Sequence, residues 1–169
     1  MTRDTFQHSS YDVVIAGGSF AGLAVALQLS GRVLLIDHRP LGEGQTSACG
    51  TTVAALRRLD ALQTVQQTHD NLILHLSPKR GRAAERVLRY HLPYQFCTFD
   101  YASLCRRLGE RAHAQGVEIV QARARGWKDG QLLTDRGAVL ARCVVDATGW
   151  RAAVASSVDA TYVKREHLS

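Results

Sequence analysis

The apolar positions near the start of the chain predict a strand, a helix and a second strand. Residues 11–16 (YDVVIA) form a short β-branched run that is typical of a buried strand. Residues 20–30 are rich in Ala and Leu and predict a helix that Gly31 ends. Residues 32–36 (RVLLI) predict a second buried strand. This order predicts a βαβ unit, with a parallel strand pair and a right-handed crossover.

The remaining pattern predicts further helices and short strands. Helical spacing of apolar residues indicates a helix from Thr51 or Thr52 to about residue 68, and another from Asp100 to Gly116. A basic turn is predicted at 77–84, and 117–134 reads as a meander of three strands with an Asp-Gly hairpin turn. The predicted strands cover 72–76, 86–92, 94–99, 117–122, 124–127, 131–134 and 138–145. We therefore expect an α/β domain over residues 11–150, with poorly ordered terminal segments at 1–10 and 151–169.

Composition and charge narrow the class of protein. The 169 residues are 46% hydrophobic and 21% charged, which is a globular composition and excludes disordered, collagen-like and disulfide-scaffold chains. The net charge of +6 suits an anionic partner, which would be a nucleotide, a nucleic acid or a membrane surface, but a solvated basic face is favoured over a polyanion site. The basic run at residues 79–89 lacks interleaved stacking aromatics, so a solvated hairpin is favoured over a nucleic-acid site.

Cysteine usage and the longest apolar run indicate the compartment. The four cysteines form no CxxC pair, and no histidine cluster has metal-ligand spacing, so we expect reduced thiols, no metal site and a cytoplasmic protein. The apolar run at 13–29 contains three glycines, and the leader before it is polar and mixed in charge. It therefore predicts a buried strand and helix rather than a membrane span or a signal peptide.

The segment between the first strand and the first helix has the pattern of a dinucleotide-binding turn. That turn requires Gly-x-Gly-x-x-Gly, and the residues here are Gly17, Gly18, Ser19, Phe20, Ala21 and Gly22. The first and third glycines are present, and the second is Ser19, which is small and can donate its hydroxyl to a phosphate. Asp37 stands 20 residues beyond Gly17, at the end of the second strand, where a carboxylate accepts hydrogen bonds from ribose hydroxyls. A carboxylate also repels a 2′-phosphate, which argues against NADP, although the nearby Arg39 is a cation.

A second glycine-containing turn follows the last predicted strand. The segment 144–149 (VVDATG) ends a strand with small residues, which allows a backbone to approach a ligand closely. Alone, it reads as an ordinary strand end.

The order of these pieces resembles the FAD domain of the glutathione-reductase-like flavoproteins. It looks most like the branch of geranylgeranyl reductases, lycopene cyclases, halogenases and aromatic hydroxylases, over residues 11–150. The resemblance implies a Rossmann-like domain with a parallel sheet and a β-meander, which is incomplete relative to the full family fold. It also implies a set of cofactor-binding residues: Gly17, Gly18, Ser19, Phe20, Ala21, Gly22, Asp37, His38, Arg39, Cys49, Gly50, Ala124, Ala147 and Gly149.

Within that set, the glycine turn would hold the FAD pyrophosphate and Asp37 the adenosine ribose. Ala124 would lie near the adenine and Ala147–Gly149 near the nucleotide, while Ala48-Cys49-Gly50 is similar to an element near the flavin in geranylgeranyl reductases. Tyr101 departs from the family, which often has Asp-Arg where this chain has Asp100-Tyr101.

The family's returning Gly-Asp segment is absent after Gly149, so the chain looks like the front portion of a flavoenzyme in a truncated, split or decayed form. The complete enzyme is expected to take electrons from NAD(P)H and to act on an apolar small molecule, with a second chain as one source of the missing domain. No catalytic residue is assigned. A nucleotide-binding or interaction module without turnover is the alternative, and a plain NAD-binding domain is disfavoured by the meander.

Overall fold

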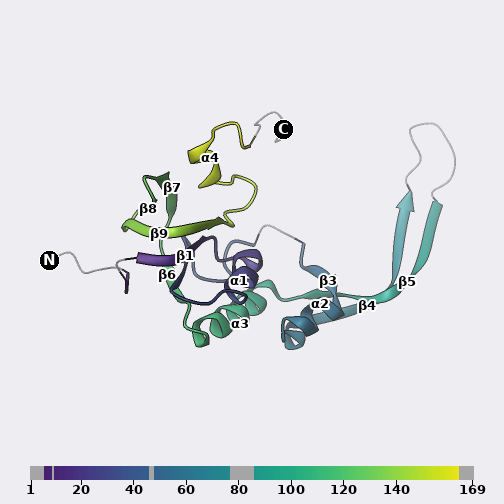
Figure 1. The fold of residues 1–169 in the computed structure, drawn as a ribbon. Coiled ribbons are helices and arrows are strands. Elements are labelled where there is room, and N and C mark those ends of the chain that lie inside the picture. The colour runs from purple at the N-terminus through teal and green to yellow at the C-terminus, as the bar shows by residue number, and fades with distance from the viewer. Residues whose placement is uncertain (1–5, 9, 46–47, 77–85, 164–169) are drawn as a thin grey trace. The chain divides into compact units, whose positions relative to one another are not determined.

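The computed structural model describes residues 6–8, 10–45, 48–76 and 86–163 (Figure 1). The chain divides into two compact units, Met1–Gln45 with Ala102–Ser169, and Thr46–Tyr101. Each unit is described by itself. The basic turn predicted at 77–84 lies outside the described residues.

A six-stranded sheet in the order β6-β2-β1-β9-β8-β7 forms the first unit. Its strands pair in parallel from β6 to β9, and β9, β8 and β7 pair antiparallel. The bounds are β1 Ser10–Ala16, β2 Val33–Asp37, β6 Glu118–Gln121, β7 Ala124–Lys128, β8 Gln131–Thr134 and β9 Gly137–Asp146. The predicted α/β fold with a mainly parallel sheet and a β-meander is confirmed.

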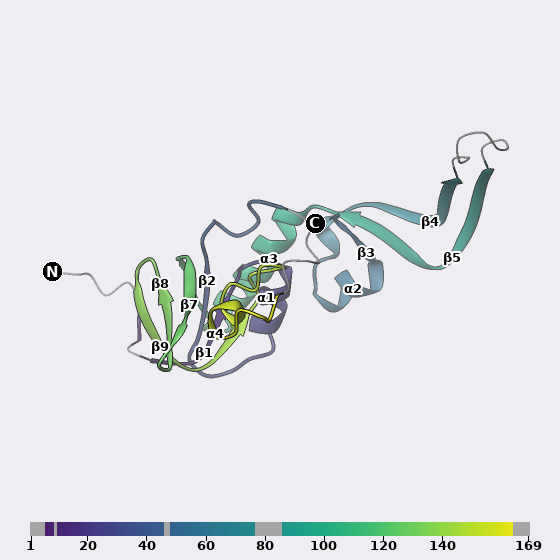
Figure 2. The ribbon, with the colours of Figure 1, turned by 90° about the horizontal axis from the view of Figure 1, so that it is seen from above.

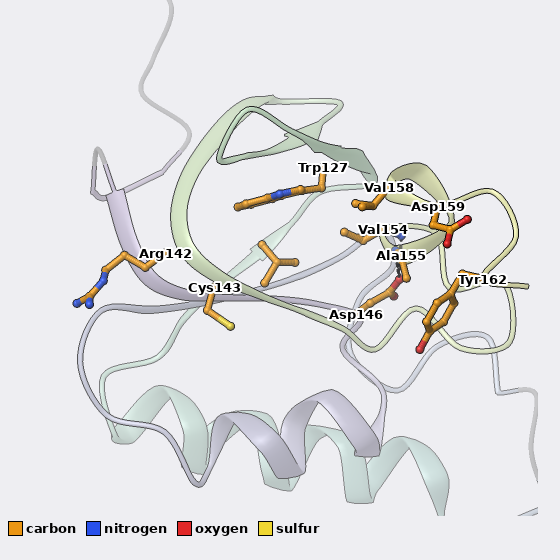
Figure 3. Close-up of a pocket in the computed structure, with 10 residues that line it drawn as sticks. Trp127, Arg142, Cys143, Asp146, Val154, Ala155, Val158, Asp159 and Tyr162 are labelled. Carbon is orange, nitrogen blue, oxygen red and sulfur yellow. Dashed lines mark hydrogen bonds between the residues drawn. The ribbon is translucent and has the colours of Figure 1, made fainter.

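Side-chain alternation along the strands gives this sheet two buried faces. Helices α1 (Phe20–Ala26) and α3 (Tyr101–Ala114) lie on one side of the parallel strands, and the antiparallel strands lie on the other (Figures 1 and 3). On the antiparallel side, Val14 of β1 and Leu34 of β2 share a core cluster with Leu132 of β8. The successive residue Ile15 is equally buried, so β1 is covered on both faces, as its uninterrupted apolar run predicts.

The composition of the meander differs from the prediction. The segment predicted as its first strand contains β6, which pairs in parallel with β2 from Leu34↔Glu118 to Asp37↔Gln121. The meander consists of β7, β8 and β9, and β9 continues from it into the parallel sheet beside β1. A short apolar run has the same appearance in either setting, because periodicity does not identify the strand with which it pairs.

The second unit contains a three-stranded antiparallel sheet in the order β3-β5-β4. Its elements are β3 Gly50–Thr52, α2 Val53–Arg58, the 3-10 helix η1 Leu62–Thr64, β4 Val65–Leu76 and β5 Arg86–Phe99. The helix predicted to reach residue 68 is wrong beyond Arg58, because Asp60 takes a left-handed φ of 49° and the chain then enters β4. The two strands predicted on either side of Pro93 are the single strand β5. In the pairing of β5 with β4, the paired residues of β5 go from Phe96 directly to His91. Pro93 is therefore not required to donate a backbone N–H to the sheet, which proline cannot do.

Two further observations concern the predicted tail and a membrane span. Residues 151–163 include α4 (Ala155–Val158), a short helix that hydrogen bonds to Asp146 attach to the end of β9. Across the described residues, no helix combines the length and the apolar character needed to cross a membrane.

A buried tyrosine joins β1 to β6 at the edge of the sheet where the parallel strands begin. The Tyr11 hydroxyl donates to Glu118 Oε2, and the backbone N–H of Gln7 donates to the other carboxylate oxygen at 3.0 Å. Tyr11 is 1% exposed. Burial, together with the hydrogen bond to Glu118, raises the pKa of Tyr11 to about 12.

We predict that Tyr11→Phe lowers the free energy of unfolding by about 1–2 kcal/mol at neutral pH, because Glu118 loses a hydrogen-bond donor. The neutral tyrosine stabilises the fold below its unfolded pKa of about 10, and this contribution is lost as the pH rises towards the folded pKa of about 12. Urea unfolding across this range should therefore show the wild-type advantage shrinking with rising pH. An advantage that stays constant up to pH 12 would contradict the assignment.

Candidate functional site

The carboxyl ends of the parallel strands define one edge of the sheet. On one side of β1 lie β2 and then β6, and on the other side of β1 lies β9. The strand order therefore reverses between β1 and β9. Open α/β sheets bind ligands in the crevice outside the carboxyl ends at such a switch point. The two glycine-containing turns of the sequence follow β1 and β9, so both lie at this place.

Gly17 leaves β1 in contact with the turn that follows β9. Its φ is +117°, and a Cβ atom added there would lie 2.2 Å from the carbonyl oxygen of Ala147. The Ala147 N–H donates to the carbonyl of Ala16 at 2.8 Å, and the Gly17 N–H donates to the carbonyl of Ile36 at 2.8 Å. Only glycine satisfies both the backbone angle and the space, so the two turns meet backbone to backbone.

Gly22 brings the first turn of α1 equally close to the strand end. A Cβ atom there would fall 1.9 Å from the carbonyl oxygen of Gly17 and 3.3 Å from the Cβ atom of Ala147. Ser19 has extended backbone before α1, and its carbonyl accepts the Leu23 N–H at 3.0 Å. Phe20 is 40% exposed, whereas Ala21 lies on the first turn of the helix. The predicted turn from Gly17 to Gly22 therefore has the close packing that its glycines indicate.

Asp37 ends β2 and lies against the same turn. Its Oδ2 accepts the Gly18 N–H at 2.7 Å, and its Oδ1 accepts the Arg39 N–H at 2.8 Å. The Nδ1 atom of His38 lies 3.2 Å from Oδ1, and the Asp37 side chain is 22% exposed. Each carboxylate oxygen has two lone pairs, so Asp37 can hold the turn and still accept hydrogen bonds from a ligand.

Asp146 fixes the Ala-Thr-Gly turn after β9. Its Oδ1 accepts both the N–H and the hydroxyl of Thr148, at 3.0 and 2.6 Å. Its Oδ2 accepts the N–H groups of Val154 and Ala155 at 2.9 and 2.8 Å, which attaches α4 to the turn. Partial burial opposes ionisation of Asp146, but these hydrogen bonds outweigh it and lower the pKa of the carboxyl below its usual value.

The sequence singled out the Ala-Thr-Gly turn but gave no role to Asp146. An acid directly before small residues and a glycine at a strand end was the available signal, because such an acid can accept the N–H groups that the turn exposes. Gly149 ends this turn with a φ of +83°.

The other predicted residues are Ala124 in the first unit and Cys49 and Gly50 in the second. Ala124 begins β7, just after the Ala122 N–H donates to the carbonyl of Asp37 at 2.8 Å. Cys49 and Gly50 belong to the second unit, where Gly50 of β3 packs against the Phe96 ring of β5. Their roles stay predictions. The described residues contain no group of three metal-ligating side chains.

A surface pocket of about 430 Å³ is lined by residues of β7, β9 and the α4 region (Figure 3). Apolar side chains from β7, β9 and the α4 region form much of its wall, and the carboxylate of Asp146 at its edge is already engaged by backbone donors. The lining residues are Trp127, Arg142, Cys143, Val144, Asp146, Val154, Ala155, Val158, Asp159 and Tyr162. None of the predicted cofactor-binding residues is among them.

Comparison with known proteins identifies the fold. No protein-family model and no curated protein matches the chain by sequence. A geranylgeranyl bacteriochlorophyll reductase-like protein from Thermoplasma acidophilum matches with a TM-score of 0.70 and 16% identity, over 92% of this chain and 43% of that one. PqsL of P. aeruginosa matches at 0.63 and 19%, over 83% and 43%. A 2-methyl-3-hydroxypyridine-5-carboxylic acid oxygenase matches at 0.61 and 24%, over 90% and 43%.

These likenesses show that the chain has the Rossmann-like fold of FAD-binding domains. The chain spans less than half of the length of each of these three proteins.

We predict that Gly17→Ala lowers the free energy of unfolding by at least about 2 kcal/mol, because the added methyl group meets the Ala147 carbonyl and forces a strained φ. Gly137→Ala is the matched control, since Gly137 has a similar φ of +120° with nothing within 4 Å of its added Cβ. Gly137→Ala should lower the free energy of unfolding only by the cost of the strained φ angle. Equal losses for the two variants in urea unfolding would mean that the contact with Ala147 carries no constraint.

We predict that Asp146→Asn lowers stability by about 1–3 kcal/mol at neutral pH, because a neutral amide accepts fewer and weaker hydrogen bonds. Because the pKa of Asp146 is lower in the folded state, the ionised carboxyl stabilises the fold above its unfolded pKa of about 4. This stabilisation is lost as the pH falls through the folded pKa, so the difference in stability between Asp146→Asn and the wild type should shrink in acid. Thermal melts from neutral to acidic pH measure this. Asp129→Asn is the control, because Asp129 lies at a hairpin turn with a φ of 50°, which Asn tolerates. A difference that does not change with pH would contradict the prediction.

Proposed function

We propose that this chain is the FAD-binding portion of a flavin-dependent oxidoreductase of the reductase or monooxygenase type. One observation carries the proposal: at the switch point of the sheet, the turns after β1 and β9 meet with no side chain between them, and Asp37 lies beside them. The fold that the chain shares with reductase-like and oxygenase structures supports it.

The residues present fit the nucleotide half of FAD. A pyrophosphate needs backbone that it can approach without meeting a side chain, and Gly17, Gly18 and Gly22 carry no side chain beside the close contact with Ala147. Asp37 would accept the ribose hydroxyls, with His38 and Arg39 next to it. In the same proposal, Ala124 would contact the adenine and Gly149 the nucleotide, and the family resemblance gives Cys49 and Gly50 a role near the flavin.

The bound flavin would supply the redox chemistry, taking electrons from NAD(P)H and passing them to an apolar substrate or to oxygen. The residues of this chain bind and orient the nucleotide. The carboxylate of Asp37 favours an unmodified ribose at this site, because it would repel a 2′-phosphate.

The proposal extends to the region that would complete the substrate site. The matched region is 43% of the T. acidophilum protein, so we infer that a further polypeptide region, in this chain's continuation or in a second chain, completes the flavin and substrate pockets. A nucleotide-binding module that does not turn over is the second candidate, because the geometry of the two turns and Asp37 supports nucleotide binding by itself. Electron transfer from NAD(P)H to a bound flavin discriminates between the two.

We predict that FAD binds to the purified chain and raises its melting temperature, whereas NAD at equal concentration does not. Asp37→Ala should raise the Kd for FAD by about tenfold or more, because it removes both the ribose acceptor and the partner of the Gly18 N–H. Asp129→Asn, far along the chain in the β7–β8 hairpin, should leave the Kd unchanged. Quenching of flavin fluorescence measures binding.

The opposite results are equally informative. If NAD raises the melting temperature and FAD does not, the site is a plain NAD site and the proposal fails. Where FAD binds, addition of NADH or NADPH to the complex under anaerobic conditions tests turnover. Bleaching of the flavin band supports the oxidoreductase, and a band that persists with both donors supports the module without turnover.

A further inference from the structure

The outer part of the β4–β5 hairpin has one apolar face. Residues paired across an antiparallel ladder point to the same face, and successive pairs alternate. The pairs Leu72↔Tyr90, Leu74↔Leu88 and Leu76↔Arg86 share one face, and Asn71↔His91, Ile73↔Arg89 and His75↔Val87 share the other. We call Leu72, Leu74, Leu76, Leu88 and Tyr90 the apolar stripe. The opposite face is mixed, with a guanidinium and imidazoles among its side chains.

Nothing in the described part of the second unit covers the apolar stripe. Leu72 is 46% exposed, Leu74 39%, Leu76 46% and Tyr90 50%. The third strand, β3, pairs with β5 only near its end, from Phe96 to Thr98. Figure 2 shows the outer hairpin running past β3 and α2 of the same unit. Because an isolated two-stranded hairpin is marginally stable in water, an exposed stripe of this kind indicates a surface that is covered in the working protein.

The charges at the two ends of the apolar stripe are opposite. Arg86 ends it on one side, opposite Leu76. Asp70 precedes Leu72 by two residues at the other end, and it is exposed. It is the single carboxylate in the sequence of β4 and β5. A second copy of the hairpin laid antiparallel on the first would place each Arg86 beside the other copy's Asp70.

We propose that the apolar stripe is the interface of a homodimer, in which two hairpins stack face to face about a two-fold axis. Stacked sheets lie about 10 Å apart, which suits interdigitated leucines, and a two-fold interface needs a surface that is complementary to itself. The stripe meets this condition in charge, because Arg86 and Asp70 lie at its opposite ends. A lipid surface is a poorer match at the Asp70 end of the stripe, because an anionic membrane repels this carboxylate.

The first test uses two lysine substitutions on adjacent residues that point to opposite faces. Sedimentation equilibrium of the full chain should show a monomer–dimer equilibrium. Leu74→Lys places a charge in the stripe and should raise the dimer Kd by about tenfold or more. Ile73→Lys is the matched control, being 44% exposed on the other face, and should leave the Kd within about twofold. Circular dichroism confirms that both variants fold.

The second test reverses the charges at the ends of the stripe. Arg86→Glu should raise the dimer Kd by roughly threefold to tenfold, because two exposed ion pairs become repulsive. The double variant Asp70→Arg with Arg86→Glu should restore the wild-type Kd at low salt. A restored dimer Kd would be specific to the antiparallel arrangement, because exchanging the two charges would not repair a variant that had lost its fold.

Three results would overturn the proposal. The wild type could remain a monomer at every concentration, both lysine variants could dissociate equally, or the charge-reversed double variant could be weaker than either single one. Co-sedimentation with phosphatidylglycerol vesicles is run in parallel. A monomer that binds these vesicles through Leu74 would assign the stripe to a membrane surface instead.

Discussion

The backbone contact between Gly17 and Ala147 is the constraint on which the ligand-facing edge of this sheet depends. It joins the ends of β1 and β9, which are neighbours in the sheet but 130 residues apart along the chain. A side chain at Gly17 would separate these ends, since its Cβ would overlap the Ala147 carbonyl, and one at Gly22 would push α1 off the strand. The contact therefore fixes the strands, the helix and both turns together, and it leaves no side chain between the two turns where the strand order reverses.

Two carboxylates act on this edge in different ways. Asp146 is used by the structure, because Thr148, Val154 and Ala155 donate hydrogen bonds to it and attach α4 to the turn. Asp37 is held by two backbone donors and stays 22% exposed, so it retains acceptor capacity towards a ligand. The same chemical group thus stabilises one turn internally and offers a binding contact beside the other.

Local signals predicted the geometry of the glycine turn better than they predicted the pairing of distant strands. The spacing of Gly17, Gly22 and Asp37 reflects contacts made within one βαβ unit, so the sequence contains that part of the geometry. The place of β6 could not be predicted, because its apolar run fits a meander as well as a parallel sheet and only the tertiary fold pairs it with β2. The helix predicted beyond Arg58 failed for a similar reason, since Leu62 and Val65 fit a helical period while the pairing of β4 with β5 draws the segment into a sheet.

The most direct test of the account is amide hydrogen exchange with and without FAD. The account predicts that FAD slows exchange at the Gly17–Gly22 turn, at Asp37–Arg39 and at Ala147–Gly149, while the apolar stripe on β4 and β5 is unaffected. Protection confined to the pocket beside Trp127 and Tyr162, or protection at neither turn, would contradict it.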